Sequence, residues 1–120
     1  MNIQSFILVF IGGGLGSIIR YGLSVLIPAT RLFYLSTFLA NGLAAFLIGF
    51  FLMRYQHNPE QYWFKLFFAT GICGGLSTFS TFSFEHFQLI QQARYAELGA
   101  YIISSLIFCL IALFIGYKLA

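Results

Sequence analysis

The sequence has very little charge. Only 8% of its 120 residues are charged, and Asp and Glu together number three, whereas charged residues make up about a quarter of an ordinary soluble domain. The hydrophobic fraction is 60%, so too few polar side chains remain to cover a water-exposed surface. We therefore predict a membrane protein rather than a soluble domain.

Side chains that carry out chemistry are equally scarce. The two histidines, His57 and His86, are far apart, and no pair of carboxylates suits acid–base catalysis or metal-dependent hydrolysis. The two cysteines, Cys73 and Cys109, lie in apolar runs without metal-ligand spacing, which predicts small core residues. Lys and Arg occur singly instead of forming a basic stripe. We expect neither an enzyme nor a nucleic-acid-binding protein.

The few charges divide the chain into four uncharged runs of 19 to 22 residues. A bilayer core of roughly 30 Å requires about 20 helical residues. The runs predict an all-α membrane protein with four transmembrane helices in one domain, residues 1–120, with no room for a catalytic domain. We place the helices at about residues 3–27, 33–54, 62–93 and 97–118. The first run lacks the features of a cleaved signal, so we expect it to be retained.

Positive charges are balanced between the two ends of these helices. Since Lys and Arg normally set orientation, an even balance predicts insertion in both directions. Four short helices are too few to enclose a polar path, which favours an antiparallel, dual-topology homodimer. The alternative is a parallel dimer oriented by a charge outside this count. The residues counted are Arg54, Lys65 and Lys118 on the side of the termini, and Arg20, Arg31 and Arg94 on the other.

Glycine spacing predicts close packing between helices. G-x-x-x-G steps begin at Gly12 and at Gly71, and small residues recur every fourth position from Asn41 on the second helix. Such steps let helix backbones approach each other closely. They indicate a tight bundle without indicating what it does.

The third span is longer than one crossing needs and contains residues 71–83, which are unlike their surroundings. Gly74 and Gly75 lower helix propensity by about 1 kcal/mol each, and Ser77 and Thr78 can cap a restarting helix. We predict a helix broken mid-membrane near residues 74–78. Freed carbonyls there favour a cation and freed amides an anion. Two antiparallel chains would hold one monovalent cation with four backbone carbonyls.

Two phenylalanines follow the predicted break. Phe79 and Phe82 are three positions apart and share one helix face, and the positive edges of their rings suit an anion. In a chain with 16 Phe, such a pair more commonly faces lipid or core. Interleaved hydroxyls favour the polar path instead, and these belong to Ser77, Thr78, Ser80, Thr81 and Ser83.

These motifs resemble one family over essentially the whole chain. GGLSTFSTF ending at Phe82, GGGLGSIIRY ending at Tyr21, and Asn41-Gly42 look like the CrcB/Fluc fluoride channels. The resemblance implies a transmembrane channel domain that forms an antiparallel dual-topology dimer with two pores. It also implies a central structural sodium ion, not transported, whose carbonyl ligands come from Gly74 and Ser77.

The same resemblance implies a fluoride pathway. Phe79 and Phe82 would form its aromatic part and Asn41 a donor beside it. In the last helix, Tyr101 and Ser105 match a hydroxyl track that Cys109 then interrupts. The pathway residues are Asn41, Phe79, Ser80, Thr81, Phe82, Tyr101 and Ser105.

Two charged residues near the pathway have two interpretations each. Glu85 lies about 12 Å along a helix from Ser77 and is either a functional vestibule group or a hydrated interfacial side chain. Arg20 either draws anions into a vestibule or reaches the interface from the helix end, and we expect both to contribute.

The resulting hypothesis is a fluoride-specific channel in the bacterial inner membrane, in contact with lipid, that exports fluoride passively. The chain contains no ATP motif and no proton relay. A small multidrug-resistance-type transporter is the first alternative, but it needs an acidic residue in its first helix and residues 1–19 contain none. A non-conducting membrane subunit is the second.

Overall fold

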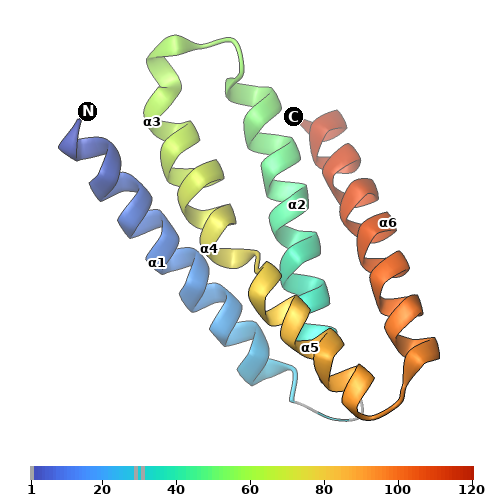
Figure 1. Ribbon diagram of the computed structural model, residues 1–120. Coiled ribbons are helices and arrows are strands. Elements are labelled where there is room, and N and C mark those ends of the chain that lie inside the picture. The colour runs from blue at the N-terminus through green and yellow to red at the C-terminus, as the bar shows by residue number, and fades with distance from the viewer. Residues whose placement is uncertain (1, 29, 31) are drawn as a thin grey trace.

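The computed structural model describes residues 2–28, 30 and 32–120. Helices account for nearly all of the described chain, and Figure 1 shows them as one elongated bundle. The long helices are α1 (Ile3–Leu26), α2 (Leu35–Tyr55) and α6 (Tyr95–Leu119). The segment between α2 and α6 comprises the 3₁₀ turn η1 (Pro59–Gln61), α3 (Tyr62–Phe64), the π-helix η2 (Lys65–Cys73), α4 (Gly74–Leu76) and α5 (Phe79–Gln91).

Four segments are long and apolar enough to cross a membrane: Ile3–Leu26, Leu35–Tyr55, Pro59–Gln91 and Tyr95–Leu119. The prediction of an all-α membrane protein with four spanning segments is therefore confirmed. Both chain ends and the α2–η1 connection lie at one end of the bundle, and the connections α1–α2 and α5–α6 lie at the other (Figure 1). Neighbouring spans consequently run in opposite directions.

The helix bounds differ from the predicted ones by a few residues. The second helix begins at Leu35 instead of residue 33, and the last begins at Tyr95 instead of residue 97. The third segment starts earlier, because Pro59 occupies the first turn of η1, where its missing N–H costs nothing. Part of the predicted connection between the first two helices, including Arg31, lies outside the described residues.

Helix α1 packs against η2 and α4 through backbone contact. A Cβ added at Gly12 would lie 2.4 Å from the Phe67 carbonyl oxygen, and one at Gly16 would lie 2.1 Å from that of Ile72. From the opposite side, a Cβ at Gly75 would lie 2.2 Å from the Gly13 carbonyl oxygen. No larger residue fits these three positions without moving a backbone. The close packing predicted from the two G-x-x-x-G steps is confirmed.

Helices α2 and α6 also pack through glycines that lie against backbone carbonyl groups. A Cβ at Gly49 would lie 2.2 Å from the Leu113 carbonyl oxygen, and one at Gly116 would lie 2.1 Å from that of Phe46. Spacing on the second helix indicates Gly49, but Gly116 belongs to no G-x-x-x-G step in its helix. Its role depends on which helix packs against it.

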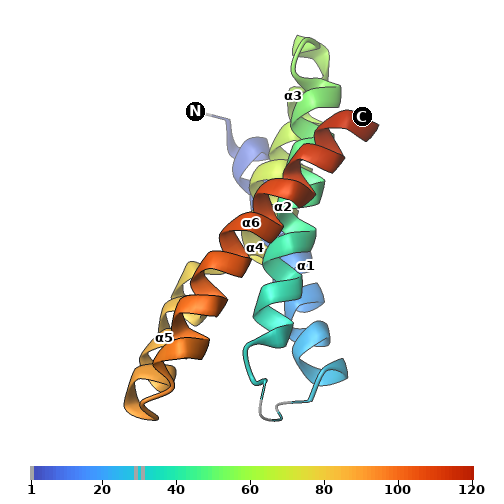
Figure 2. The same cartoon turned by 90° about the vertical axis from the view of Figure 1, so that its right-hand side faces the viewer.

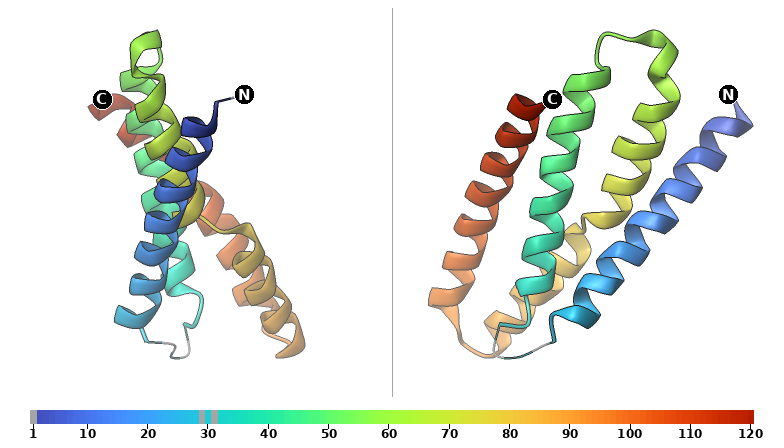
Figure 3. Two further views of the ribbon diagram at one scale, coloured as in Figure 1. Left: turned by 90° about the vertical axis from the view of Figure 1, so that its left-hand side faces the viewer. Right: turned by 180° about the vertical axis from the view of Figure 1, so that it is seen from behind.

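Helix α5 does not continue in line with α4. Figure 2 and Figure 3 show α5 and the first half of α6 leaning away from α1 and α2, so that the bundle opens toward the α5–α6 end. At that end, Ala93 adopts a positive φ of 53°, and the Arg94 N–H donates to the Leu89 carbonyl at 2.9 Å. This is the Schellman pattern that terminates helices. A sharp corner thus holds α5 and α6 together as a pair.

Candidate functional site

The backbone leaves the helical conformation at Ser77 and Thr78, between α4 and α5. Their φ/ψ values are −76°/153° and −152°/121°, both extended. Gly74 is helical, with φ −64° and ψ −37°. The non-helical stretch is therefore shorter than the predicted 74–78, and Gly75 contacts α1 instead of opening the helix. Two hydroxyl residues, not the glycine pair, occupy the non-helical positions.

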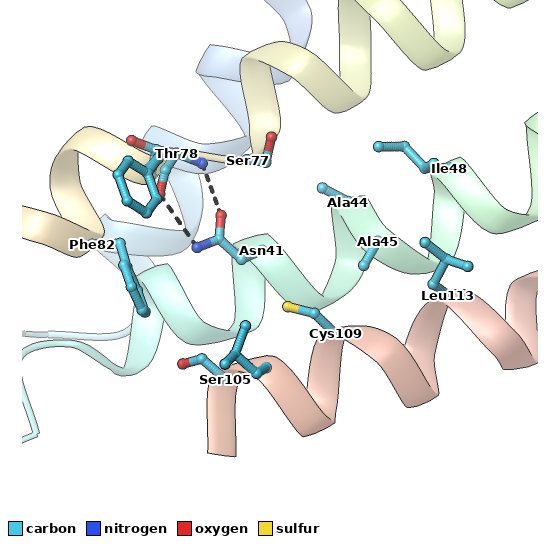
Figure 4. Close-up of a pocket in the computed structure, with 12 residues that line it drawn as sticks. Asn41, Ala44, Ala45, Ile48, Ser77, Thr78, Phe82, Ser105, Cys109 and Leu113 are labelled. Atoms are coloured by element: carbon cyan, nitrogen blue, oxygen red, sulfur yellow. Dashed lines mark hydrogen bonds between the residues drawn. The ribbon is translucent and has the colours of Figure 1, made fainter. Parts of the chain in front are cut away.

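Asn41 of α2 holds this stretch in place. The Thr78 N–H donates to Asn41 Oδ1 at 2.8 Å, and Asn41 Nδ2 donates to the Thr78 carbonyl at 3.3 Å (Figure 4). One amide side chain thereby pairs both backbone groups of one residue, which is how an asparagine can substitute for a missing helical turn. The sequence predicts Asn41 as a donor beside an anion path, and its amide is engaged with the backbone here.

The carbonyl groups of residues 74–77 lose their helical donors at this point, and the new partners of two of those donors are known. In an unbroken α-helix, each N–H donates to the carbonyl four residues earlier. The Thr78 N–H instead donates to Asn41, and the Thr81 N–H donates to the Thr78 hydroxyl oxygen at 3.2 Å. The carbonyls that would have accepted from them belong to Gly74 and Ser77. The change in hydrogen bonding thus includes the two residues assigned to sodium, together with Gly75 and Leu76 between them.

An open apolar cavity of about 370 Å³ adjoins the non-helical stretch. It brings together residues from α2, α5 and α6, as Figure 4 shows. Phe79 lies at the edge of the cavity and is 80% exposed. Its ring centroid lies 5.9 Å from that of Phe82. Of the predicted pathway residues, the lining includes Asn41, Phe79, Phe82 and Ser105, together with Ser77 and Cys109.

The remaining predicted pathway residues lie elsewhere around Thr78. Tyr101 does not line the apolar cavity, but its ring lies 5.1 Å from that of Phe82. Ser80 and Thr81 each lie 3.2 Å from the Thr78 hydroxyl through their own hydroxyl oxygens. The structure therefore divides the predicted pathway residues into a group that lines the cavity and a group that extends from it.

Glu85 lies in a buried polar cluster. Its two carboxylate oxygens accept hydrogen bonds from the Thr37 hydroxyl at 2.6 Å and from the Tyr101 hydroxyl at 2.8 Å. Only 5% of Glu85 is exposed, so its carboxyl group is surrounded mainly by protein atoms. A buried carboxylate needs donors of this kind, and they come from α2 and α6. Glu85 therefore links three helices.

A second cavity, of about 460 Å³, lies between α5 and the helices α1 and α2, and it is more polar than the first. Arg20, Thr81 and Glu85 line it, with hydroxyls from α1 and α2. Arg20 Nε donates to the Gly75 carbonyl at 3.1 Å, so the guanidinium turns toward α4 rather than toward the end of α1. The two predicted vestibule residues, Arg20 and Glu85, thus share one cavity.

Sequence reasoning missed Thr37 and His86 as members of this region. His86 follows Phe82 by one helical turn, and its Nδ1 lies 2.6 Å from the Phe82 carbonyl oxygen, so i,i+4 spacing was a usable signal. Thr37 gives no local signal, because its partner Glu85 is far away in the sequence. At the α5–α6 corner, the hydrogen bond to Glu97 raises the pKa of Arg94 above its usual value.

Within the described part of the chain, His, Cys, Asp and Glu side chains form no group of three that could hold a metal ion. A cation bound near Ser77 would depend on backbone and hydroxyl oxygens. Such ligands suit a hard, weakly charged ion better than a transition metal.

Four spanning segments, one of them interrupted beside an aromatic cavity, define a small multi-pass membrane protein. The family model described as CrcB-like protein, Camphor Resistance (CrcB), matches residues 7–117. The chain belongs to this family, which confirms the resemblance inferred from the three motifs. A multi-pass location in the cell membrane follows from the family and the four apolar segments.

Curated relatives match over the full length. A protein of Pyrococcus abyssi is 37% identical over 122 residues, which cover 100% of this chain and 98% of the relative. One of Pyrococcus furiosus is 40% identical with the same coverage, and one of Azobacteroides pseudotrichonymphae is 41% identical over 98% and 96% of the two chains. All three are named fluoride-specific ion channel FluC. Their names describe channels, which supports the prediction that this chain is not an enzyme.

Proposed function

We propose that this protein is a fluoride-specific channel that lets cytoplasmic fluoride leave the cell passively. The observation that carries the proposal is the extended stretch at Ser77 and Thr78, held by Asn41 and opening on the Phe79–Phe82 cavity. The names of the relatives give the identity of the ion. We place this stretch at mid-membrane, because it divides the third spanning segment.

Each part of the site suits a small, strongly hydrated anion. Helix α5 begins directly after Thr78, so its first amide groups supply positive potential. The edges of Phe79 and Phe82 attract an anion and disfavour cations. The Ser105 hydroxyl oxygen is buried and has no hydrogen-bond partner among the described residues. A buried unpaired hydroxyl costs about 1–3 kcal/mol, and an anion in the path would accept a hydrogen bond from it.

Passive export needs no further machinery. A negative-inside membrane potential supplies about 2.3 kcal/mol per elementary charge for each 100 mV, which drives an anion outward through an open path. Fluoride enters cells in acidic surroundings as neutral hydrogen fluoride and is trapped inside as the anion. A selective pore is sufficient to return it.

A structural sodium ion is the cofactor we propose, held by the carbonyl groups of Gly74 and Ser77. The fit rests on those two carbonyls having lost their helical donors to Asn41 and to the Thr78 hydroxyl. Bound there, sodium would neutralise the partial negative charge that gathers where α4 ends. The ion would stabilise the interruption and would not be transported.

The assembly that we propose is an antiparallel, dual-topology homodimer. Phe79 is 80% exposed, and the aromatic cavity is open in a single copy, so one chain alone does not enclose a path. A second copy related by a two-fold axis would close it and would bring two interruptions together. The even distribution of Lys and Arg supports insertion in both orientations.

Ion efflux from proteoliposomes tests the proposal. The purified protein should release trapped fluoride, read with a fluoride electrode, at least about a hundredfold faster than equal trapped chloride, because desolvated sites of this kind separate anions by several kcal/mol. Equal chloride efflux would contradict fluoride specificity. Transport of a lipophilic cation without fluoride efflux would instead support the multidrug-type alternative.

Two further measurements test the finer proposals. Replacing sodium with a large organic cation should lower both the efflux rate and the melting temperature, and no change in either would contradict a structural sodium ion. Protease added outside intact cells should remove a C-terminal tag from about half of the chains, because balanced charge leaves orientation undecided. Complete cleavage or complete protection would contradict dual topology.

A further inference from the structure

His86 is a buried titratable group that the proposed pathway does not use. It is 9% exposed and lies on α5, where its ring contacts two aromatic residues of the predicted pathway, Phe82 and Tyr101. Its ring stacks on Tyr101 with centroids 4.6 Å apart and planes 4° apart, and it meets Phe82 edge to face at 4.1 Å. A change of charge on this ring would therefore be felt directly inside the path.

The hydrogen bond at Nδ1 determines which nitrogen carries the proton when the ring is neutral. Nδ1 lies 2.6 Å from the Phe82 carbonyl oxygen, and a carbonyl only accepts, so Nδ1 carries the proton. Neutral imidazole has one N–H, which leaves Nε2 with a lone pair and no donor. Nε2 is buried without a hydrogen-bond partner among residues 2–28, 30 and 32–120. It points away from the carbonyl that Nδ1 contacts.

Buried polar atoms without a partner occur on both α5 and α6 of the described chain. Two buried side-chain nitrogen or oxygen atoms have no partner there, Nε2 of His86 and Oγ of Ser105. Both adjoin Tyr101, one by stacking and the other one helical turn along α6. Unpaired buried polar atoms are rare and costly, so Nε2 of His86, on a ring that contacts Phe82 and Tyr101, lacks a partner that a small polar ligand would supply.

We propose that His86 is a proton-controlled anion donor in the fluoride path, an inference that rests on the proposed function. When neutral, Nε2 presents only a lone pair and repels fluoride. Protonation places an N–H at Nε2 and a positive charge on the ring, and fluoride accepts a charge-assisted hydrogen bond. Acidification then increases the affinity of the path for fluoride.

The charged and titratable groups around His86 determine whether its protonation raises or lowers the affinity for fluoride. On α5 the neighbouring residue is Glu85, whose carboxylate accepts from Thr37 on α2 and Tyr101 on α6. Beyond Tyr101 lies Tyr34, which stacks on it and donates to Glu97 at 3.2 Å; Glu97 in turn pairs with Arg94. With His86 neutral, its ring adds no positive charge beside the hydrogen-bonded carboxyl group of Glu85. With His86 protonated, a positive charge lies at this position and the barrier to an anion falls.

Electrical recording from purified protein in planar bilayers tests the proposal, since neutral hydrogen fluoride carries no current. The apparent fluoride affinity should increase about tenfold when the pH is lowered, because His86 then gains its second proton. His57→Asn alters the other histidine, which lies in an exposed turn, and should keep this dependence. His86→Asn retains a donor near Nδ1 but cannot gain a proton, and its affinity should not change with pH.

Each other result has a defined meaning. Fluoride current without pH dependence in the wild type would overturn the inference and leave the proposed function intact. The same pH dependence in His86→Asn would also overturn it, since Glu85 would then be the titrating group. Absence of fluoride current at every pH would overturn the proposed function and this inference together.

A spectroscopic measurement decides the matter if His86→Asn fails to fold. The His57→Asn protein contains a single histidine, so nitrogen NMR of histidine-labelled protein reports His86 alone. At low pH, Nε2 should carry a proton and its signal should move on addition of fluoride but not of chloride. An Nε2 signal that fluoride does not move would overturn the inference.

Discussion

The two parts of the third spanning segment have opposite chemistry. Upstream of Ser77, η2 and α4 contact α1 through glycine backbones, and Gly71 and Gly75 leave no space for a side chain. Downstream of Thr78, α5 carries the paired rings of Phe79 and Phe82 and the buried Glu85. The upstream part is fixed by shape and the downstream part by hydrogen bonds.

This difference explains where a membrane protein can tolerate polar groups. Backbone groups at membrane depth need partners, and Asn41 supplies them for Thr78. Because the upstream part is held rigidly against α1, α5 can diverge from α1 and α2 and form the wall of two cavities. Tight packing on one side thus makes an open, polar region possible on the other.

The largest effect is expected in the upstream contact. Gly16→Ala would place a Cβ 2.1 Å from the Ile72 carbonyl oxygen, and overpacking against backbone should cost about 3 kcal/mol of folding stability or more. Gly14→Ala is the matched control, since nothing lies within 4 Å of its Cβ. Thermal unfolding in detergent measures both. Equal stability of the two variants would show that the glycine contact does not hold the upstream part.

The next effect concerns the link between the two parts. Asn41→Ala removes the partners of the Thr78 N–H and carbonyl, and each unpaired buried group costs about 1–3 kcal/mol. We expect fluoride efflux to fall about tenfold or more, as the positions of Ser77 and Thr78 are lost. Asn58→Ala, in the exposed η1 turn, should leave efflux unchanged. Wild-type efflux from Asn41→Ala would refute its anchoring role.

The smallest effect is expected at the edge of the cavity, and stability and efflux should change in opposite directions. Ser105→Ala removes a buried hydroxyl without a partner in the described chain, so stability should rise slightly, whereas fluoride efflux should fall about threefold through loss of one donor. Ser104→Ala alters the neighbouring exposed serine and should affect neither. Loss of stability in Ser105→Ala together with unchanged efflux would indicate a purely structural hydroxyl.

Sequence reasoning identified the spans and the glycine contacts because both depend on local patterns. Apolar length fixes a spanning segment, and G-x-x-x-G spacing at Gly12 and Gly71 fixes a close approach. It placed the interruption near residues 74–78 because helix propensity treats Gly74 and Gly75 as breakers, and the non-helical positions are Ser77 and Thr78. Their actual role depends on α1, which lies beside them.

The candidate site was predicted less completely for the same reason. Motif spacing indicated Phe79 and Phe82, and the family resemblance indicated Ser105; all three line one cavity. The partners of Glu85 could not be predicted, since Thr37 and Tyr101 come from two other helices. Pairings between distant segments leave no periodic signal in the sequence, and α5 and α6 bring them together only after the chain turns at Ala93.

The central claim is that the upstream part of the third spanning segment is structural and the downstream part lines the fluoride path. The most direct test compares one phenylalanine from each part. Phe68 stacks on Phe51 in the upstream part at 4.4 Å, and Phe82 lines the cavity downstream. Fluoride efflux should be measured for Phe82→Ile and Phe68→Ile at equal amounts of folded protein. We predict a loss of about tenfold or more for Phe82→Ile, because the aromatic edge that favours the anion is gone, and a near wild-type rate for Phe68→Ile. Equal rates in the two variants would contradict a fluoride path along α5.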